Sequence, residues 1–226
     1  MPLIRQLEAW INVRFCSGVR VLVVGAGTGA EVFAFARLGC EVYGVEPDSD
    51  AVEIIRAKAA CLHLAPESVI QGVGEAIPFG DNAFDLVWCF TVLEHVQNVR
   101  RCIEEMIRVT KPLGRIFVVT PDYRQFWENH YKLPLPMFAP RWMVKVMLRW
   151  RRRPTKYFDT LQFVNAKQLV NIFMNHPVVA FQVIQSWPKE WKSQLTLPMR
   201  AIKWIIQHMG IQREQFWILH KLEKPR

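Results

Sequence analysis

The hydrophobic pattern of the first 120 residues alternates between short apolar runs and stretches with helical spacing. Five apolar, largely β-branched runs predict buried parallel strands, at residues 19–24, 41–45, 68–71, 84–90 and 115–120. Apolar residues recurring every three or four positions predict the neighbouring helices, at residues 2–15, 28–38, 49–63 and 96–110. Strands that alternate with single helices predict an α/β fold with a parallel sheet and right-handed crossovers.

After Pro121 this regularity ends. Residues 122–160 are rich in Trp, Pro, Tyr and Arg and show no clean alternation. Beyond them the pattern resumes and predicts a helix, a strand, a second helix and a last strand, at residues 165–174, 178–186, 198–209 and 216–222. Because no repeat or low-complexity linker interrupts the chain, we expect one domain over residues 1–226, with residues 122–160 inserted in it.

The first strand runs into a glycine-rich turn. Val24 is followed by Gly25, Gly27 and Gly29, and the second strand ends in the carboxylate of Glu46. Glycines allow a tight turn and a close approach of the backbone to a ligand, while an acid after the second strand can accept from both ribose hydroxyls. The pair predicts an adenosine-bearing cofactor, although Gly25, Gly27 and Ala30 alone are also compatible with a dinucleotide fingerprint.

Four further motifs follow in order: Gly-Glu-Ala-Ile-Pro-Phe at 74–79, Phe-Asp-Leu-Val at 84–87, Val-Leu-Glu-His-Val at 92–96 and Arg-Val-Thr-Lys-Pro-Leu-Gly-Arg at 108–115. Together with the glycine turn, they closely resemble class I S-adenosylmethionine-dependent methyltransferases of the ubiquinone/menaquinone-methyltransferase type. The resemblance implies a Rossmann-like, doubly wound sheet of seven strands whose last strand is antiparallel. It also implies a helical lid, the substrate-binding insertion after strand five.

The resemblance further implies which residues hold S-adenosylmethionine. Those expected along the methionine and ribose are Gly25, Ala26, Gly27 and Gly29. The ribose hydroxyls fall to Glu46, and the positions beside the adenosine are Pro47, Asp48, Gly74 and Glu75. The residues expected next to the sulfonium are Phe90 and Thr91.

Two positions depart from the family pattern. Val73 replaces an aspartate that usually reaches the adenine amino group, which lends support to a non-catalytic fold that keeps the cofactor as a structural ligand. Thr91 occupies the position of a glutamate that metal-dependent ubiquinone O-methyltransferases carry, so no metal site is expected. An NAD(P)-dependent oxidoreductase is a further alternative, because the glycine turn alone does not exclude it.

Transfer to a hydroxyl requires a base, and histidine is the usual candidate because its pKa lies near neutrality. His95 follows strand four, and His130 lies in the expected lid, so both are candidate catalytic residues for O-methylation of a small-molecule, glycan or lipid-linked acceptor. For His95 the alternative is that Glu94 and His95 begin the next helix and bond its free amides. For His130 the alternative is a lid histidine that only bonds the backbone.

The formal charge of +9 is unevenly distributed. Residues 1–120 carry 11 Lys and Arg against 14 Asp and Glu, a net charge of −3, whereas residues 121–226 carry 18 against 6, a net charge of +12. The second half is therefore expected to meet an anionic partner. In residues 141–153, cations recur at helical spacing beside an apolar stripe of Trp142, Met143, Val146, Met147 and Trp150.

Such a helix suits a membrane surface rich in anionic lipids, and it equally suits a lid helix that packs on the core with a solvated basic edge. Nucleic acid is the least favoured partner, because the chain has no recognised RNA-binding module. The first eight residues do not form a signal peptide, and the five scattered cysteines suggest a reducing compartment. We therefore expect a cytoplasmic protein, with peripheral attachment at the inner face of the membrane as its further option.

Overall fold

The computed structural model describes residues 2–59, 64–121, 127–128, 133–134, 140–153, 155, 158, 161–184 and 214–223. Its helices are α1 (Pro2–Ile11), α2 (Ala30–Arg37), α3 (Ser49–Ala59), α4 (Val99–Val109), α5 (Arg141–Trp150) and α7 (Ala166–Met174). The strands are β1 (Arg20–Val24), β2 (Glu41–Glu46), β3 (Val69–Gln71), β4 (Phe84–Phe90), β5 (Thr110–Pro121), β6 (Trp127–Glu128), β7 (Leu133–Pro134), β8 (Val179–Ile184) and β9 (Glu214–Lys221).

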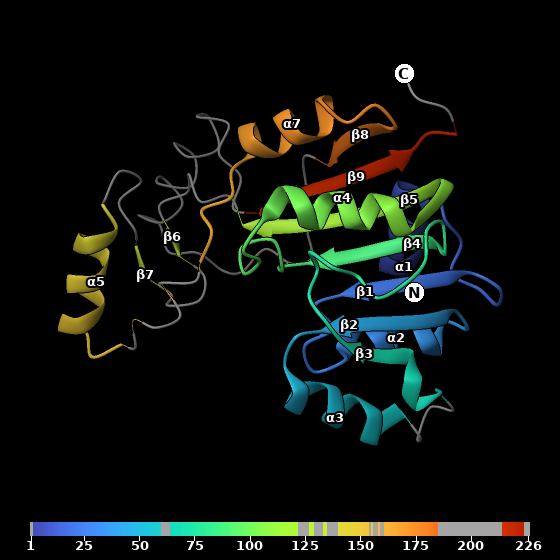
Figure 1. The fold of residues 1–226 in the computed structure, drawn as a ribbon, viewed down its shortest axis with the longest axis horizontal. Coiled ribbons are helices and arrows are strands. Elements are labelled where there is room, and N and C mark those ends of the chain that lie inside the picture. The colour runs from blue at the N-terminus through green and yellow to red at the C-terminus, as the bar shows by residue number, and fades with distance from the viewer. Residues whose placement is uncertain are drawn as a thin grey trace.

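Seven strands form one twisted sheet in the order β3-β2-β1-β4-β5-β9-β8 (Figure 1). Strands β1 to β5 pair in parallel, and β9 runs antiparallel to both of its neighbours, β5 and β8. The central strand β1 is buried on both faces from Val21 to Val24, as expected of a parallel strand covered by helices. The predicted seven-stranded sheet with an antiparallel last strand is confirmed.

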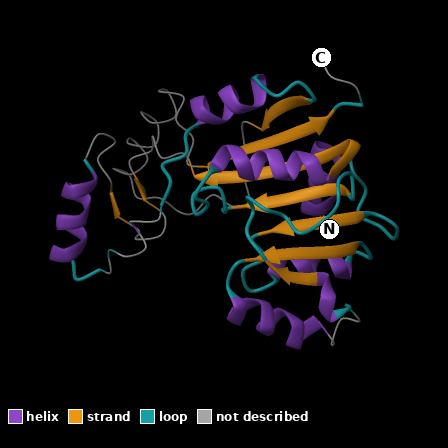
Figure 2. Cartoon of the chain, in the orientation of Figure 1, coloured by secondary structure: helices purple, strands orange, loops and turns teal. Residues whose placement is uncertain are grey.

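Helices cover both faces of the sheet (Figure 2). Side chains from α1, α2 and α3, among them Ile11, Phe35 and Ile55, share one apolar core with the sheet. Side chains from α4 and α7, among them Met106 and Phe173, share the other. Cys89 and Cys102 are buried, and both lie in this second core. Two cores on opposite faces are what a doubly wound arrangement requires.

Some boundaries differ from the sequence prediction. The helix expected at 96–110 begins at Val99, because the Asn98 side chain caps it by accepting from the Arg101 amide at 3.0 Å. Strand five was expected from residue 115, whereas β5 begins at Thr110, which pairs with Phe84 before a shift in register. The first helix ends at Ile11 rather than at residue 15. The helix expected at 198–209 lies outside the described residues.

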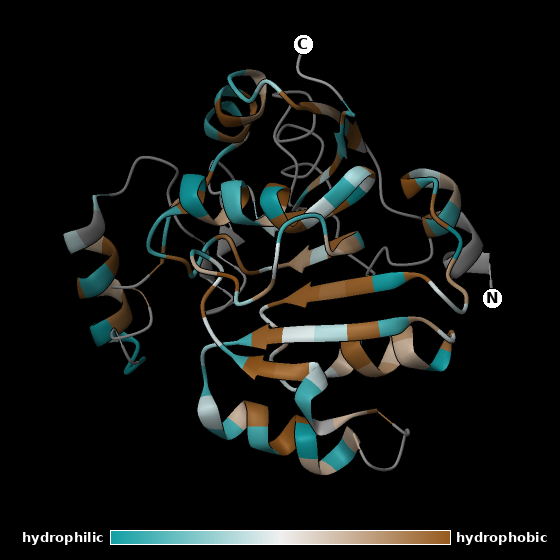
Figure 3. Ribbon diagram, turned by 45° about the vertical axis from the view of Figure 1, so that its right-hand side comes forward, coloured by the Kyte–Doolittle hydropathy of each residue, from teal (hydrophilic) through white to brown (hydrophobic). Residues whose placement is uncertain are grey.

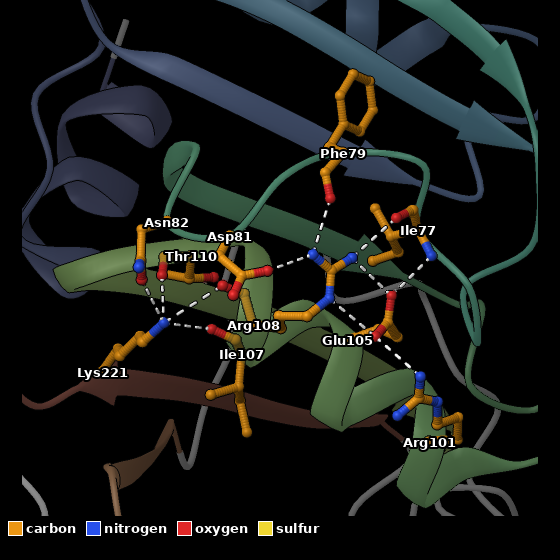
Figure 4. A network of polar contacts seen from close by, with 10 residues as sticks. All are labelled: Ile77, Phe79, Asp81, Asn82, Arg101, Glu105, Ile107, Arg108, Thr110 and Lys221. Atoms are coloured by element: carbon orange, nitrogen blue, oxygen red, sulfur yellow. Dashed lines mark hydrogen bonds and ion pairs between the residues drawn. The ribbon is translucent and has the colours of Figure 1, made fainter.

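A network of ionic contacts ties α4 to the loop after β3 and to β9 (Figure 4). The Arg108 guanidinium donates to the Glu105 carboxylate at 2.8 and 2.9 Å and to Asp81 Oδ1 at 2.7 Å, and Glu105 also accepts from the Ile77 amide at 3.0 Å. Lys221, at the end of β9, donates to the carbonyl oxygens of Ile107 and Thr110 at 2.8 and 2.7 Å. These contacts hold the C-terminal end of α4, which lies away from the carboxyl ends of the parallel strands (Figure 1).

Helix α5 confirms that residues 122–160 contain a helix, and its role as a lid stays a prediction. Its Val144 and Leu148 form a small apolar cluster with Phe158 and Leu161, distinct from the two sheet cores. Within the described part of the chain, no helix combines the length and the apolar character needed to cross a membrane.

Candidate cofactor-binding site

Strand register brings the predicted cofactor residues to one edge of the sheet. Val24 of β1 pairs with Val45 of β2 on one side and with Cys89 of β4 on the other. The next residue of each strand is therefore Gly25, Glu46 or Phe90, and these three lie in one row at the carboxyl ends. This edge is where ligands bind in open parallel sheets.

The glycine turn is held against the second strand by backbone hydrogen bonds. The amides of Gly25 and Ala26 both donate to the Val45 carbonyl oxygen, at 2.8 and 3.1 Å. Gly25 has a φ of +69°, and a Cβ at this position would lie 2.4 Å from Val92 Cγ2. Only glycine fits there, because both the backbone conformation and the contact exclude a side chain.

Gly27 sits in a different environment. Its φ is +53°, but a Cβ built on it would meet no atom within 4 Å. The space above this residue is open, although its amide is firmly held by a hydrogen bond to Glu46. Gly27 therefore presents bare backbone to the open side of the turn, as a loop that receives a ligand must.

Glu46 lies at the centre of the site. Its buried carboxylate accepts from the Gly27 amide through Oε2 at 2.7 Å and from the Asp48 amide through Oε1 at 3.1 Å. A carboxylate offers about four acceptor positions, so two remain for ribose hydroxyls. The carboxylate thus joins the glycine turn to the end of β2 and can still accept hydrogen bonds from two ribose hydroxyls, as the sequence predicts.

Asp48 and Pro47 have structural roles at the start of α3. Asp48 Oδ1 accepts from the amides of Asp50 and Ala51, at 2.9 and 3.4 Å, and so caps the helix. The Pro47 carbonyl oxygen accepts from Gln71 Nε2 at 3.2 Å, which links this loop to β3. Both residues adjoin Glu46, where the sequence predicts the adenosine.

The loop after β3 contributes Gly74 and Glu75. Gly74 packs against α4 so closely that a Cβ would lie 2.7 Å from Cys102 Sγ. Glu75 Oε1 accepts from the amides of Gln97 and Asn98, at 2.6 and 3.1 Å. Its carboxylate therefore supports the segment that leads into α4. Val73 is exposed, at the position where the family usually has aspartate.

Burial raises the pKa of the Cys102 thiol to about 12 and the pKa of the Cys89 thiol well above its ordinary value. Both groups therefore stay protonated at neutral pH, and neither provides a thiolate nucleophile beside this edge. Among the described residues, no cluster of three or more His, Cys, Asp or Glu side chains could hold a metal ion.

The loop after β4 begins with a strained residue. Thr91 has a φ of +54°, which is unfavourable for a β-branched side chain, and its amide donates to the Val119 carbonyl oxygen at 2.8 Å. Such strain costs on the order of 1–3 kcal/mol and is concentrated at functional sites. Phe90 and Thr91 lie where the family resemblance implies the sulfonium. The strained backbone of Thr91 also points to a functional site there, and it could not be predicted from the sequence.

Glu94 and His95 do not begin α4, so that alternative interpretation is wrong. Asn98 caps the helix, while the His95 amide donates to the Val92 carbonyl oxygen at 2.8 Å within a turn. The Glu94 carboxylate is fully buried and accepts from Thr120 Oγ1 at 3.1 Å. A role for Thr120 could not be predicted, since a threonine at the end of an apolar strand has no distinguishing sequence pattern. His130 lies outside the described residues.

Comparison with known proteins identifies the domain. A family model described as a methyltransferase domain matches residues 22–118. The chain is 34% identical over 100 residues to the uncharacterized methyltransferase YcgJ of Bacillus subtilis, covering 44% of this chain and 40% of that protein. The crystal structure of YcgJ superimposes with a TM-score of 0.62 at 20% identity, over 97% of this chain and 99% of that one.

Two relatives carry more specific names. The ubiquinone biosynthesis O-methyltransferase of Rhodopseudomonas palustris is 29% identical over 153 residues, which cover 68% of this chain and 55% of that protein. The thiol S-methyltransferase TMT1B of Rattus norvegicus is 33% identical over 135 residues, which cover 59% of this chain and 51% of that protein. The chain spans about half the length of the curated relatives it matches. The matched residues, the sheet order and the glycine turn agree: residues 22–118 are a methyltransferase domain with the fold of the class I S-adenosylmethionine-dependent enzymes.

Proposed function

We propose that this protein transfers a methyl group from S-adenosylmethionine to an oxygen of a small-molecule, glycan or lipid-linked acceptor. When bound, S-adenosylmethionine supplies a methyl group activated on a sulfonium. The protein then has to hold the acceptor in line with that methyl group and keep water away, so positioning and desolvation carry much of the rate.

The observation that carries this proposal is the Glu46 carboxylate beside the open glycine turn. Glu46 is buried, oriented by the amides of Gly27 and Asp48, and left with acceptor capacity for two hydroxyls. The open space above Gly27 is the place a cofactor needs for close approach to the backbone. These residues fit the ribose and methionine parts of S-adenosylmethionine, with Gly25, Ala26, Gly29, Phe90 and Thr91 around them.

Oxygen is the acceptor atom that the histidines favour. An acceptor hydroxyl must lose its proton, and a nearby imidazole takes protons readily near neutral pH. We assign this role to His130, with His95 as the second candidate. The named relatives include an O-methyltransferase and a thiol S-methyltransferase, so the names alone leave the acceptor atom open.

The test is transfer of a radiolabelled methyl group. The protein is incubated with methyl-labelled S-adenosylmethionine and, separately, with catechol-type quinols, sugars and lipid-linked glycans, and the products are identified by mass spectrometry. We expect label in an ether linkage for one acceptor class, with Glu46→Ala at least tenfold slower than the unmodified protein. Label on carbon or sulfur would contradict the oxygen assignment.

Exposed Val73 gives some support to a second candidate, a fold that retains the cofactor without catalysis, because the usual adenine contact is missing. That candidate predicts S-adenosylhomocysteine binding without transfer to any acceptor. The oxidoreductase alternative predicts saturable binding of a nicotinamide dinucleotide instead. A pair of titrations, with S-adenosylhomocysteine and with NAD, therefore separates the oxidoreductase from the other two functions, and the methyl-transfer assay separates the methyltransferase from the non-catalytic fold.

A further inference from the structure

Helix α5 is apolar on two opposite sides. Val144 and Leu148, four residues apart, are buried against Phe158 and Leu161. Trp142, Val146 and Trp150 repeat the same spacing two residues out of step, which places them on the other side of the helix. The sequence does not reveal which stripe packs inward. In the structure it is the stripe of smaller side chains, Val144 and Leu148, that is buried.

The outer stripe is exposed to a degree that is uncommon for such side chains. Trp142, Val146 and Trp150 are 66%, 56% and 80% exposed. Figure 3 shows α5 at the edge of the molecule, with apolar positions along its length. Scattered exposed apolar residues are ordinary, but a continuous stripe with two tryptophans indicates an interaction surface.

Cations accompany this stripe. Arg149, Arg151, Arg152 and Arg153 are all exposed, and the sequence has no Asp or Glu from residue 141 to residue 153. We define the α5 surface as Trp142, Val146, Trp150 and these four arginines. Its partner must accept apolar side chains and supply negative charge at the same place.

We propose that the α5 surface docks this protein on a membrane that contains anionic lipids. Tryptophan sits favourably at the boundary between headgroups and acyl chains, and arginine binds the lipid phosphates. Trp142 and Trp150 lie about 12 Å apart along the helix, with an aliphatic side chain between them. That spacing suits insertion into a lipid surface better than stacking on successive bases of a nucleic acid.

Docking through this surface also orients the cofactor edge. Leu161, which packs on α5, is followed by Gln162, whose amide donates to the Glu94 carbonyl oxygen at 2.7 Å. Glu94 belongs to the loop after β4, so α5 is attached to the edge that holds the cofactor residues. In Figure 1, α5 lies on the side toward which the parallel strands point. The proposal concerns the surface alone and does not depend on methyl transfer.

The experiment is co-sedimentation with vesicles of neutral phosphatidylcholine and with vesicles containing 30% phosphatidylglycerol. Three variants are compared. One carries Glu at positions 149, 151, 152 and 153, and one carries Ser at positions 142, 146 and 150. The matched control carries Glu in place of four exposed cations elsewhere: Arg14, Arg37, Lys58 and Lys167.

Each arginine near an anionic surface changes the partition coefficient about fivefold, so the arginine variant should bind anionic vesicles well over tenfold more weakly. The serine variant should also bind at least tenfold more weakly, while the matched control, with the same net charge as the arginine variant, should retain most binding. Far-ultraviolet circular dichroism checks that each variant is folded. Equal recovery with neutral and anionic vesicles, equal loss in the matched control, or full binding by the serine variant would overturn the proposal. So would tighter binding of single-stranded polynucleotide than of vesicles.

Discussion

The Glu46 carboxylate lies 2.7 Å from the Gly27 amide and bridges the end of β2 to the glycine turn. Its other oxygen accepts from the Asp48 amide at 3.1 Å, so one side chain orients both the glycine turn after β1 and the loop after β2. This relationship gives the acid a structural role in addition to its expected contact with ribose. Substitutions at Glu46 should therefore affect both folding stability and cofactor affinity.

Glu46→Gln should lower the free energy of unfolding by about 1–3 kcal/mol. An amide group cannot accept from both backbone donors, because its nitrogen is itself a donor. Urea denaturation monitored by circular dichroism measures the change. Glu53→Gln, an exposed position on α3, is the matched control and should change stability by less than about 0.5 kcal/mol. Equal stability of the two variants would mean that Glu46 does not hold the turn.

Gly27→Ala should cost about 1–2 kcal/mol of stability, because alanine disfavours a positive φ. Its methyl group would enter the open space above the turn, so S-adenosylhomocysteine affinity should fall at least tenfold. Gly18→Ala is a close control, since Gly18 also has a positive φ and no atom within 4 Å of a built Cβ. It should cost similar stability and leave the affinity unchanged. Calorimetric titration of both variants with S-adenosylhomocysteine measures the two affinities. Equal affinities would show that the glycine turn is not part of the cofactor site.

The sheet could be predicted from the sequence because each buried strand is a short apolar run and is separated from the next helix by a recognisable turn, such as the glycine-rich turn after the first strand. The stretch from Phe84 to Phe90 is predicted without error, and Gly25 and Glu46 lie at one edge as expected. Parallel strands need apolar residues on both faces, so a continuous apolar run identifies such a strand even when its tertiary contacts are unknown.

Other features depend on contacts that no local pattern records. The strained backbone of Thr91 and the burial of Glu94 beside Thr120 arise from strand ends that are distant in sequence. The side of α5 that packs inward depends on Phe158 and Leu161. Glu75 has a family motif that points to adenine, yet its carboxylate bonds the amides before α4.

Acid should weaken the network around Glu105. The hydrogen bonds from Arg108 hold the pKa of the Glu105 carboxyl below its ordinary value, with the Ile77 amide adding to the effect against the opposing effect of burial. A lowered pKa means that the charged form stabilises the folded state above the unfolded pKa of about 4.3. This stabilisation is lost as the pH falls through the lower, folded pKa.

Glu105→Gln should therefore lower the free energy of unfolding by about 1–3 kcal/mol at pH 7. The difference from the unmodified protein should shrink as the pH is lowered below about 4.3. Urea denaturation at a series of pH values measures it, with Glu104→Gln as the neighbouring control on α4. A stability difference that stays constant with pH would show that the Glu105 charge does not act through this network.

His130→Ala should lower kcat by about 10²- to 10⁴-fold if His130 is the general base. The affinity for S-adenosylhomocysteine should stay unchanged, because the residue serves the acceptor and not the cofactor. His95→Ala tests the second candidate in the same assay, and His176→Ala, at the far end of α7, is the control. Unaltered turnover in the His130 variant would leave that residue with a structural role, and loss only in the His95 variant would transfer the assignment.

The central claim is that S-adenosylmethionine binds at the edge formed by Gly25, Gly27 and Glu46. Isothermal titration with S-adenosylhomocysteine tests it most directly, on the unmodified protein and on Glu46→Ala and Gly27→Arg. We expect one molecule bound per chain, affinity at least tenfold weaker in Glu46→Ala, no measurable binding in Gly27→Arg, and no binding of NAD by any of the three proteins. Unchanged affinity in both variants, or binding of NAD in place of S-adenosylhomocysteine, would contradict the account.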